Sequence, residues 1–167
     1  MREQQTVHAA VRVVRPPDGD RSSLSGVEDR FMIDGDDTES RFALVEHRFG
    51  PRALAAPMHR HSREDEYTFI VEGRMGAVLG DTEVFGEKGD LVFKPRNQWH
   101  TFWNAGEDPL VVLEMISPAG LERLFRSFGE LDGEPDPQKM AEMAAQYGCE
   151  LDFGATFPVV ERHGLEF

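Results

Sequence analysis

Three histidines and one glutamate lie at spacings that suit a metal site. His59 and His61 are separated by one residue, so in an extended strand their side chains point to the same face. Glu66 begins the next β-rich stretch after a four-residue spacer that is long enough to turn. His100 begins another such stretch after a turn marked by Pro95. The spacing predicts three converging ligands, and His100 can complete a set of four.

The cysteine content limits the chemistry of this site. Cys149 is the only cysteine among 167 residues, so an internal disulfide and a thiolate metal cluster are both excluded. Any metal must therefore be held by imidazole and carboxylate groups. This donor set suits divalent Fe, Mn, Ni, Cu, Co or Zn, and it does not choose among them.

The charge balance limits the partners. Eighteen Lys and Arg oppose 31 Asp and Glu, and the resulting net charge of -13 repels phosphate backbones and anionic lipid surfaces. We therefore expect no nucleic acid and no membrane as a partner. The chain starts without an apolar stretch of signal-peptide length, and no stretch approaches the roughly 18 apolar residues of a membrane span. These features favour a cytoplasmic location.

The elements that must position the four side chains are mostly strands. The length allows one domain with a substantial core. Short apolar runs separated by Gly, Asp, Pro or Asn predict strands over residues 66–72, 75–79, 83–85, 91–93, 100–103 and 110–116. Upstream, residues 31–33 and 41–49 are expected to pair across an acidic turn. Many short strands with tight turns are typical of a sandwich or barrel.

The N-terminal part differs from this pattern. Val7, Ala9, Val11 and Val13 alternate with mostly polar residues, which predicts a half-buried strand. Residues 16–29 are expected to form a loop, because they begin with a Pro, Gly and Asp cluster.

The C-terminal part is predicted to be helical. Apolar residues recur at helical spacing over residues 121–131, behind Ser117 as the expected N-cap and Pro118 in the first turn. A second helix is expected to start at residues 136–137 and to end at Gly148. We expect the apolar stripes of both helices to pack on the β-domain.

The two histidine stretches resemble the paired motifs of the cupin superfamily. The first stretch matches the family pattern at His59, His61, Glu66 and Gly73. The second stretch matches it at Gly89, Pro95, His100 and Asn104. Asn97 stands where the family usually has Gly, and Asn tolerates the left-handed backbone that such a turn requires. The resemblance covers about residues 50–104.

The resemblance implies an all-β fold, a double-stranded β-helix of jelly-roll form, with a C-terminal pair of α-helices. Residues 1–29 would be an N-terminal strand and loop, residues 30–117 the cupin barrel, and residues 118–167 a helical extension packed on it. One divalent transition metal per chain would be bound by His59, His61, Glu66 and His100. An octahedral ion would keep two positions open, as a catalytic site requires.

The helical tail resembles small single-domain cupins of the quercetin dioxygenase-like group. This favours a metal-dependent dioxygenase that acts on a small aromatic or enol-type molecule, with Glu66 as ligand and as catalytic base. Two alternatives stay open, a non-redox isomerase, cyclase or lyase and a non-catalytic small-molecule-binding cupin. The resemblance and the alternating residues 7–13 also indicate a homodimer in which that strand extends the neighbour's sheet.

Strand parity selects candidate substrate contacts. Thr68 and Ile70 share the inward face with Glu66, and Phe102 shares it with His100. The resulting pocket would be mostly apolar and would suit a flat substrate, although any barrel core needs such side chains.

Three further polar residues are weaker candidates. Glu46 and His47 could serve as acid or base, yet exposed strand positions explain them more simply. Glu114 could contact a ligand histidine, and the simpler interpretation is that it faces water.

Overall fold

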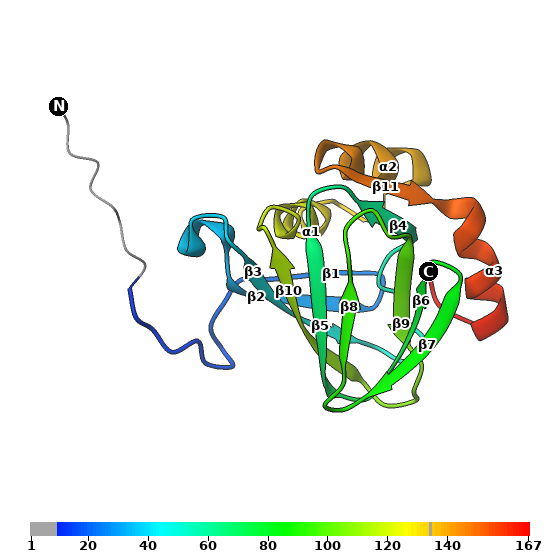
Figure 1. Cartoon of the computed structure of the whole chain (residues 1–167), viewed down its shortest axis with the longest axis horizontal. Coiled ribbons are helices and arrows are strands. Elements are labelled where there is room, and N and C mark those ends of the chain that lie inside the picture. Colours follow the sequence, from blue (N-terminus) through cyan, green and yellow to red (C-terminus); the bar gives the residue numbers. More distant parts are fainter. Residues whose placement is uncertain (1–9, 134) are drawn as a thin grey trace.

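The short alternating segments fold into two antiparallel sheets that together form a β-barrel (Figure 1). The computed structural model describes residues 10–133 and 135–167. In sheet order, the six-stranded sheet contains β1 (Arg21–Leu24), β2 (Val27–Ile33), β3 (Ala43–Phe49), β10 (Leu110–Ser117), β5 (Asp65–Glu72) and β8 (Leu91–Lys94). The five-stranded sheet contains β11 (Cys149–Asp152), β4 (Met58–His61), β9 (His100–Asn104), β6 (Arg74–Leu79) and β7 (Thr82–Glu87). The predicted barrel architecture is confirmed.

The core lies between the inner faces of these sheets. Side chains alternate along each strand, and on β5 the residues Glu66, Thr68 and Ile70 are buried while Phe69 is exposed. Around Ile70, an apolar cluster joins both sheets and includes Phe49 on β3 and Phe102 on β9. Sequence parity therefore predicts the inward face of β5 correctly.

Three α-helices cover the barrel. Helix α1 (Glu122–Gly129) and helix α2 (Pro137–Gln146) lie at one end of it, and α3 (Phe153–His163) lies beside the five-stranded sheet (Figure 1). Leu124 of α1 and Ala144 of α2 pack in one buried cluster with Val45 of β3. Val159 of α3 packs with Trp103 of β9 in another. The expected packing of the helical stripes on the β-domain is confirmed.

The predicted C-terminal boundaries need correction. Ser117 is not a helix cap, because it ends β10, where it pairs with Asp65 and donates a hydrogen bond to the Arg41 carbonyl. Helix α1 begins only at Glu122. The start of α2 is correct, with Asp136 as its N-cap, 2.9 Å from the Lys139 amide. The sequence patterns did not predict β11 or α3, so the extension contains more than a pair of helices.

The predicted N-terminal loop is wrong, because β1 lies within residues 16–29 and β2 starts there, at Val27. Strand β1 has a polar, half-exposed pattern that gives no apolar signal. Val7 and Ala9 of the predicted first strand lie outside the described residues. Val11 and Val13 lie in a described segment that forms no strand in this chain, and both are exposed. The acidic turn before β3 is confirmed as a short 3-10 helix, η1 (Gly35–Thr38), with β2 paired to β3.

Two turns place the histidine strands. Asn97 has φ of 63°, the left-handed conformation expected at this position, and its amide donates to the His61 carbonyl at 2.7 Å. Asn104 at the end of β9 donates to the carbonyls of Gly50 and Asp108. The second histidine stretch is thereby tied to β4 and to the loop after β3. No helix in the described part of the chain is long and apolar enough to cross a bilayer.

Gly76 is expected to be essential for packing at the centre of β6. A Cβ atom there would lie 2.7 Å from Nε1 of Trp103, which is 1% exposed and cannot move aside. We expect Gly76→Ala to lower the free energy of unfolding by about 1–3 kcal/mol, as overpacking does. Denaturant titration measures this change. Gly50→Ala is the matched control, because its Cβ meets only ordinary contact at 3.6 Å; an equal loss in both variants would contradict the packing explanation.

Candidate metal centre and cavity

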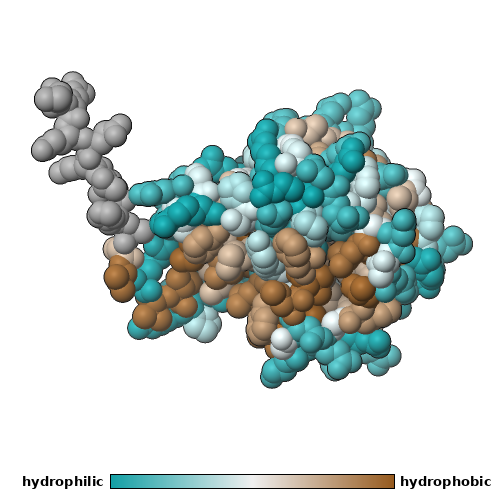
Figure 2. All heavy atoms as spheres, viewed as in Figure 1, coloured by the Kyte–Doolittle hydropathy of each residue, from teal (hydrophilic) through white to brown (hydrophobic). Residues whose placement is uncertain are grey.

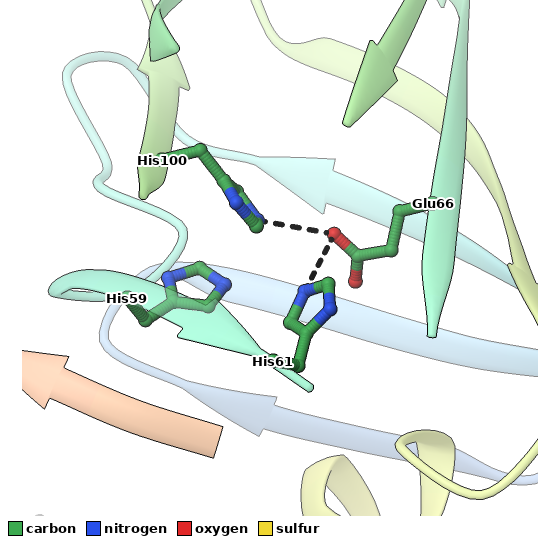
Figure 3. Close-up of side chains that lie close together, drawn as sticks. All are labelled: His59, His61, Glu66 and His100. Atoms are coloured by element: carbon green, nitrogen blue, oxygen red, sulfur yellow. Dashed lines mark ion pairs between the residues drawn. The ribbon is translucent and has the colours of Figure 1, made fainter. Parts of the chain in front are cut away.

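The four predicted ligands converge inside the barrel (Figure 3). His59 and His61 come from β4, Glu66 from β5 and His100 from β9, and all four are buried. One potential ligand atom from each lies within 4.8 Å of the others. Oε2 of Glu66 is 3.3 Å from Nε2 of both His61 and His100. Both sheets thus contribute donors to one centre.

Backbone carbonyls orient the three imidazoles. Each ring donates its Nδ1 hydrogen to a carbonyl only two or three residues away in the chain, since a carbonyl oxygen can only accept. The pairs are His59 with Pro57 at 2.7 Å, His61 with Glu64 at 2.9 Å and His100 with Gln98 at 2.9 Å. In each ring this leaves the Nε2 lone pair free for a ligand, which is the tautomer that metal-bound histidines use.

The inner imidazole nitrogens of the cluster lack hydrogen-bond partners. Among the described residues, Nε2 of His61 and Nε2 of His100 are buried without one, and both face Oε2 of Glu66, whose other neighbour is the Lys94 ammonium at 2.9 Å. Unsatisfied polar atoms of this kind are rare in folded proteins and call for a bound group. Two nitrogen atoms and a carboxylate oxygen facing one point fit a divalent transition ion, with His59 available as the fourth donor.

The protonation of the imidazoles favours metal binding at His59 and opposes it at His61. Burial and the neighbouring imidazoles hold the pKa of His59 well below its usual value, so this ring stays neutral. Burial lowers the pKa of His61, but the Glu66 carboxylate outweighs it and raises the pKa overall. A metal ion must therefore compete with a proton at His61.

Lys94 is a member of the centre that the sequence patterns did not reveal. It is fully buried on β8, and its Nζ lies 2.9 Å from Oε2 of Glu66 and in contact with Oε1 of Glu114. Burial would raise the pKa of Glu66, but Lys94 and the nearby histidines lower it well below the usual range. Glu66 is therefore ionised as a ligand must be. A carboxylate with so low a pKa is a weak base at neutral pH, so the catalytic role expected for Glu66 gains no support.

His47 and Glu114 are also buried, which corrects the expectation that they face water. Their side chains are 6% and 3% exposed, and His47 Nε2 lies 3.0 Å from Glu114 Oε2. His47 Nδ1 lies 2.7 Å from Asp29 on β2. The two carboxylates outweigh burial and raise the pKa of His47 to about 10. Glu46, by contrast, points away from this centre and pairs with Arg30 at 2.9 Å.

A cavity of about 120 Å³ opens beside the metal centre. His59, Glu66 and Phe102 line it, so the predicted contact of Phe102 with a pocket agrees with the structure. Thr68 and Ile70 point inward but are absent from its lining. The walls also include apolar side chains of α1 and α2, which Figure 1 places at this end of the barrel.

One stretch of the cavity wall is charged. Asp29, His47 and Glu114 line it together with Glu66. No spacing rule joins these residues in the sequence, because they come from four different strands. The sheet register brings them together, with Asp29 opposite His47 and Glu114 opposite Thr68.

Comparison with known proteins agrees with this fold. Residues 45–116 match the family model described as Cupin domain. KdgF from Halomonas sp. superposes with a TM-score of 0.60 at 18% identity, over 68% of this chain and 99% of that one. The polyketide cyclase RemF from Streptomyces resistomycificus superposes with a TM-score of 0.57 at 24% identity, over 65% of this chain and 80% of that one. These likenesses concern the fold.

A curated relative matches part of the chain. Tetracenomycin polyketide synthase protein TcmJ of Streptomyces glaucescens is 31% identical over 83 residues, which cover 50% of this chain and 54% of that protein. The match thus spans about half the length of TcmJ. With the matching family model, the barrel topology and the two histidine motifs in agreement, residues 45–116 of this chain form a cupin domain.

Proposed function

We propose that this chain is a metal-dependent enzyme that acts on a small, flat aromatic or enol-type molecule. The observation that carries the proposal is the position of the four donors, since His59 and Glu66 lie in the wall of an otherwise largely apolar cavity. A purely structural metal site would be closed, whereas this one faces space that a small molecule can enter. A cupin that only binds its ligand is the alternative.

The cavity supports the substrate class. Phe49, Phe102, Phe125 and Phe128 contribute aromatic walls, and apolar pockets with a few polar groups suit aromatic ligands. TcmJ is named as a polyketide synthase protein. An aromatic polyketide-type molecule, with hydroxyl and enol oxygens on a flat ring system, has the matching polarity.

A non-redox reaction of the cyclase, isomerase or lyase class is our first candidate. A divalent ion at the four donors would supply Lewis acidity toward a substrate oxygen. Such reactions also require proton transfers, and the His47 imidazole places an ionisable group along the same cavity. The quercetinase-like dioxygenase favoured by the sequence is the second candidate, because an apolar cavity also protects oxygen-sensitive intermediates from water.

The metal assignment predicts a specific loss in His61→Ala. Wild-type protein purified without chelator should carry about one transition ion per chain, and the variant should carry almost none. Metal analysis by mass spectrometry measures the content, and circular dichroism checks that the barrel is folded. His163→Ala removes a histidine outside the centre, one that contacts Trp103 and Glu83, and should keep its metal. Full metal content in both variants would exclude His61 as a ligand.

The two reaction classes predict opposite responses to oxygen and zinc. We expect turnover of an open-chain poly-β-ketone to proceed at full rate under strict anaerobiosis and to survive replacement of the native ion by zinc. Chromatographic product analysis measures turnover under each condition, and an oxygen electrode measures oxygen uptake in air. Stoichiometric oxygen uptake, and loss of turnover in the zinc form, would reject the non-redox class and establish the dioxygenase.

We further propose a homodimer formed through the outer face of the six-stranded sheet. Five side chains with large apolar surfaces are at least 36% exposed on β5, β8 and β10: Phe69, Val71, Leu91, Phe93 and Met115. Figure 2 shows an apolar band across the region where Figure 1 places these strands. A continuous apolar area of this kind marks an interaction surface, and β8 also leaves an open sheet edge. A second copy supplies a matching surface by two-fold symmetry.

If this face forms the dimer, introducing one charged side chain there should change the molecular mass of the assembly in solution. Phe93→Asp should convert a dimer into a monomer, because it buries a charge without a partner. Light scattering coupled to gel filtration measures the mass. Phe157→Asp alters a similarly exposed phenylalanine on α3 and should stay dimeric. Deletion of residues 1–14 tests whether the N-terminal segment takes part; a monomeric wild-type protein would reject the dimer altogether.

A further inference from the structure

A row of alternating charges crosses the inner face of the six-stranded sheet and ends at the metal centre. Each of five strands contributes one member to it. In the order of their contacts, the members are Glu66 of β5, Lys94 of β8, Glu114 of β10, His47 of β3 and Asp29 of β2. Apart from Glu66, this row is not needed to complete the ligand set.

Every step in the row is a direct contact between opposite charges. Lys94 Nζ lies 2.9 Å from Glu66 Oε2 and also contacts Glu114. Glu114 lies 3.0 Å from His47, and His47 lies 2.7 Å from Asp29. Side-chain exposure is 0% at Lys94 and rises only to 15% at Asp29. The charges therefore interact in a largely water-free interior, where they are screened weakly.

Packing alone does not account for this row. Burying ion pairs costs desolvation free energy, and apolar residues of the same volume usually serve a core equally well. Apart from Thr68, the rest of the inner face follows that rule, with Val45, Ile70 and Val112 among its fully buried residues. The charged groups instead form one continuous line that begins at a ligand, which indicates a role toward the ion.

The decisive contact is at one oxygen atom. Oε2 of Glu66 faces Nε2 of His61 and His100, and the same Oε2 contacts the Lys94 ammonium. A cation held by this oxygen would share it with a second cation. The repulsion is tolerable only if the charge of Lys94 is balanced from its other side, where Glu114 lies.

We propose that Lys94, Glu114, His47 and Asp29 are positioning residues that balance charge behind Glu66 and thereby set the metal affinity of the centre. The inference rests on the proposed metal site. Two cations and two anions cancel, so Glu66 keeps one net negative charge for the ion. Thr68 supports this arrangement, because its hydroxyl donates to Glu114 at 2.6 Å.

Charge balance predicts a different pattern of metal affinities among variants than a purely structural role does. Neutralising Glu114 leaves Lys94 unbalanced beside Glu66 and should weaken metal binding. Neutralising His47 leaves Glu114 fully available to Lys94 and should not weaken it. Removing Lys94 and Glu114 together restores the balance. A purely structural role predicts losses in all variants, with the double variant the worst.

The experiment measures dissociation constants for Co²⁺ and Zn²⁺ by competition with a chromophoric chelator, using the full chain. We expect Glu114→Gln to bind both ions about 10- to 100-fold more weakly, the range for residues that support metal ligands. His47→Gln should bind at least as tightly as wild type. The double variant K94M/E114Q should recover to within about threefold of wild type. The visible spectrum of bound Co²⁺ reports independently whether the ligand set is retained.

Several results would overturn the proposal. These are wild-type affinity in Glu114→Gln, weakened binding in His47→Gln, or a double variant as weak as Glu114→Gln. Asp34→Asn, which removes a charge paired with Arg126 outside the cavity, is the control and should bind normally. If the double variant fails to fold, Asp29→Asn takes its place and should weaken binding less than Glu114→Gln. Wild-type protein that binds neither ion would refute the metal site itself, whereas metal-binding wild type with losses in every variant would refute only the row.

Discussion

The ionised Glu66 inside the barrel is the constraint on which the rest of the site depends. A buried carboxylate is stable only with partners, and this one lies among two imidazoles and the Lys94 ammonium. Lys94 in turn requires Glu114, and Glu114 is held by His47. Protein groups alone therefore hold the Glu66 carboxylate in place.

The sequence predicts the strands and the ligands well because both depend on local rules. Alternation fixes which side of β5 faces inward, and the spacing of His59 and His61 fixes their shared face. The turn at Asn97 follows from the backbone preferences of one residue. Local rules also fail at some places: they misplace the helix boundary at Ser117, miss β1, β11 and α3, and predict a strand where Val11 and Val13 form none.

What the sequence does not predict depends on register between distant strands. Lys94 ends a short strand whose sequence pattern is typical of a half-exposed edge strand. Only the pairing of Lys94 opposite Glu66 makes it part of the centre. His47 and Glu114 sit in apolar alternating segments where a charged residue normally faces water. Their burial becomes intelligible only when each is seen as the partner of the other, a contact between residues 67 positions apart. Single-residue statistics cannot contain that information.

The two walls of the cavity have complementary physical roles. Apolar side chains from α1, α2 and the barrel keep water away, which lowers the local dielectric constant and strengthens every charge interaction nearby. This environment stabilises the ion pairs of the charged wall, because its members are paired and keep a fixed geometry. A flat substrate between the walls would meet oriented charges on one edge and dispersion contacts on its faces. Since proton transfers to an enol or phenol depend on groups that are positioned before the substrate arrives, this division favours catalysis over simple ligand storage.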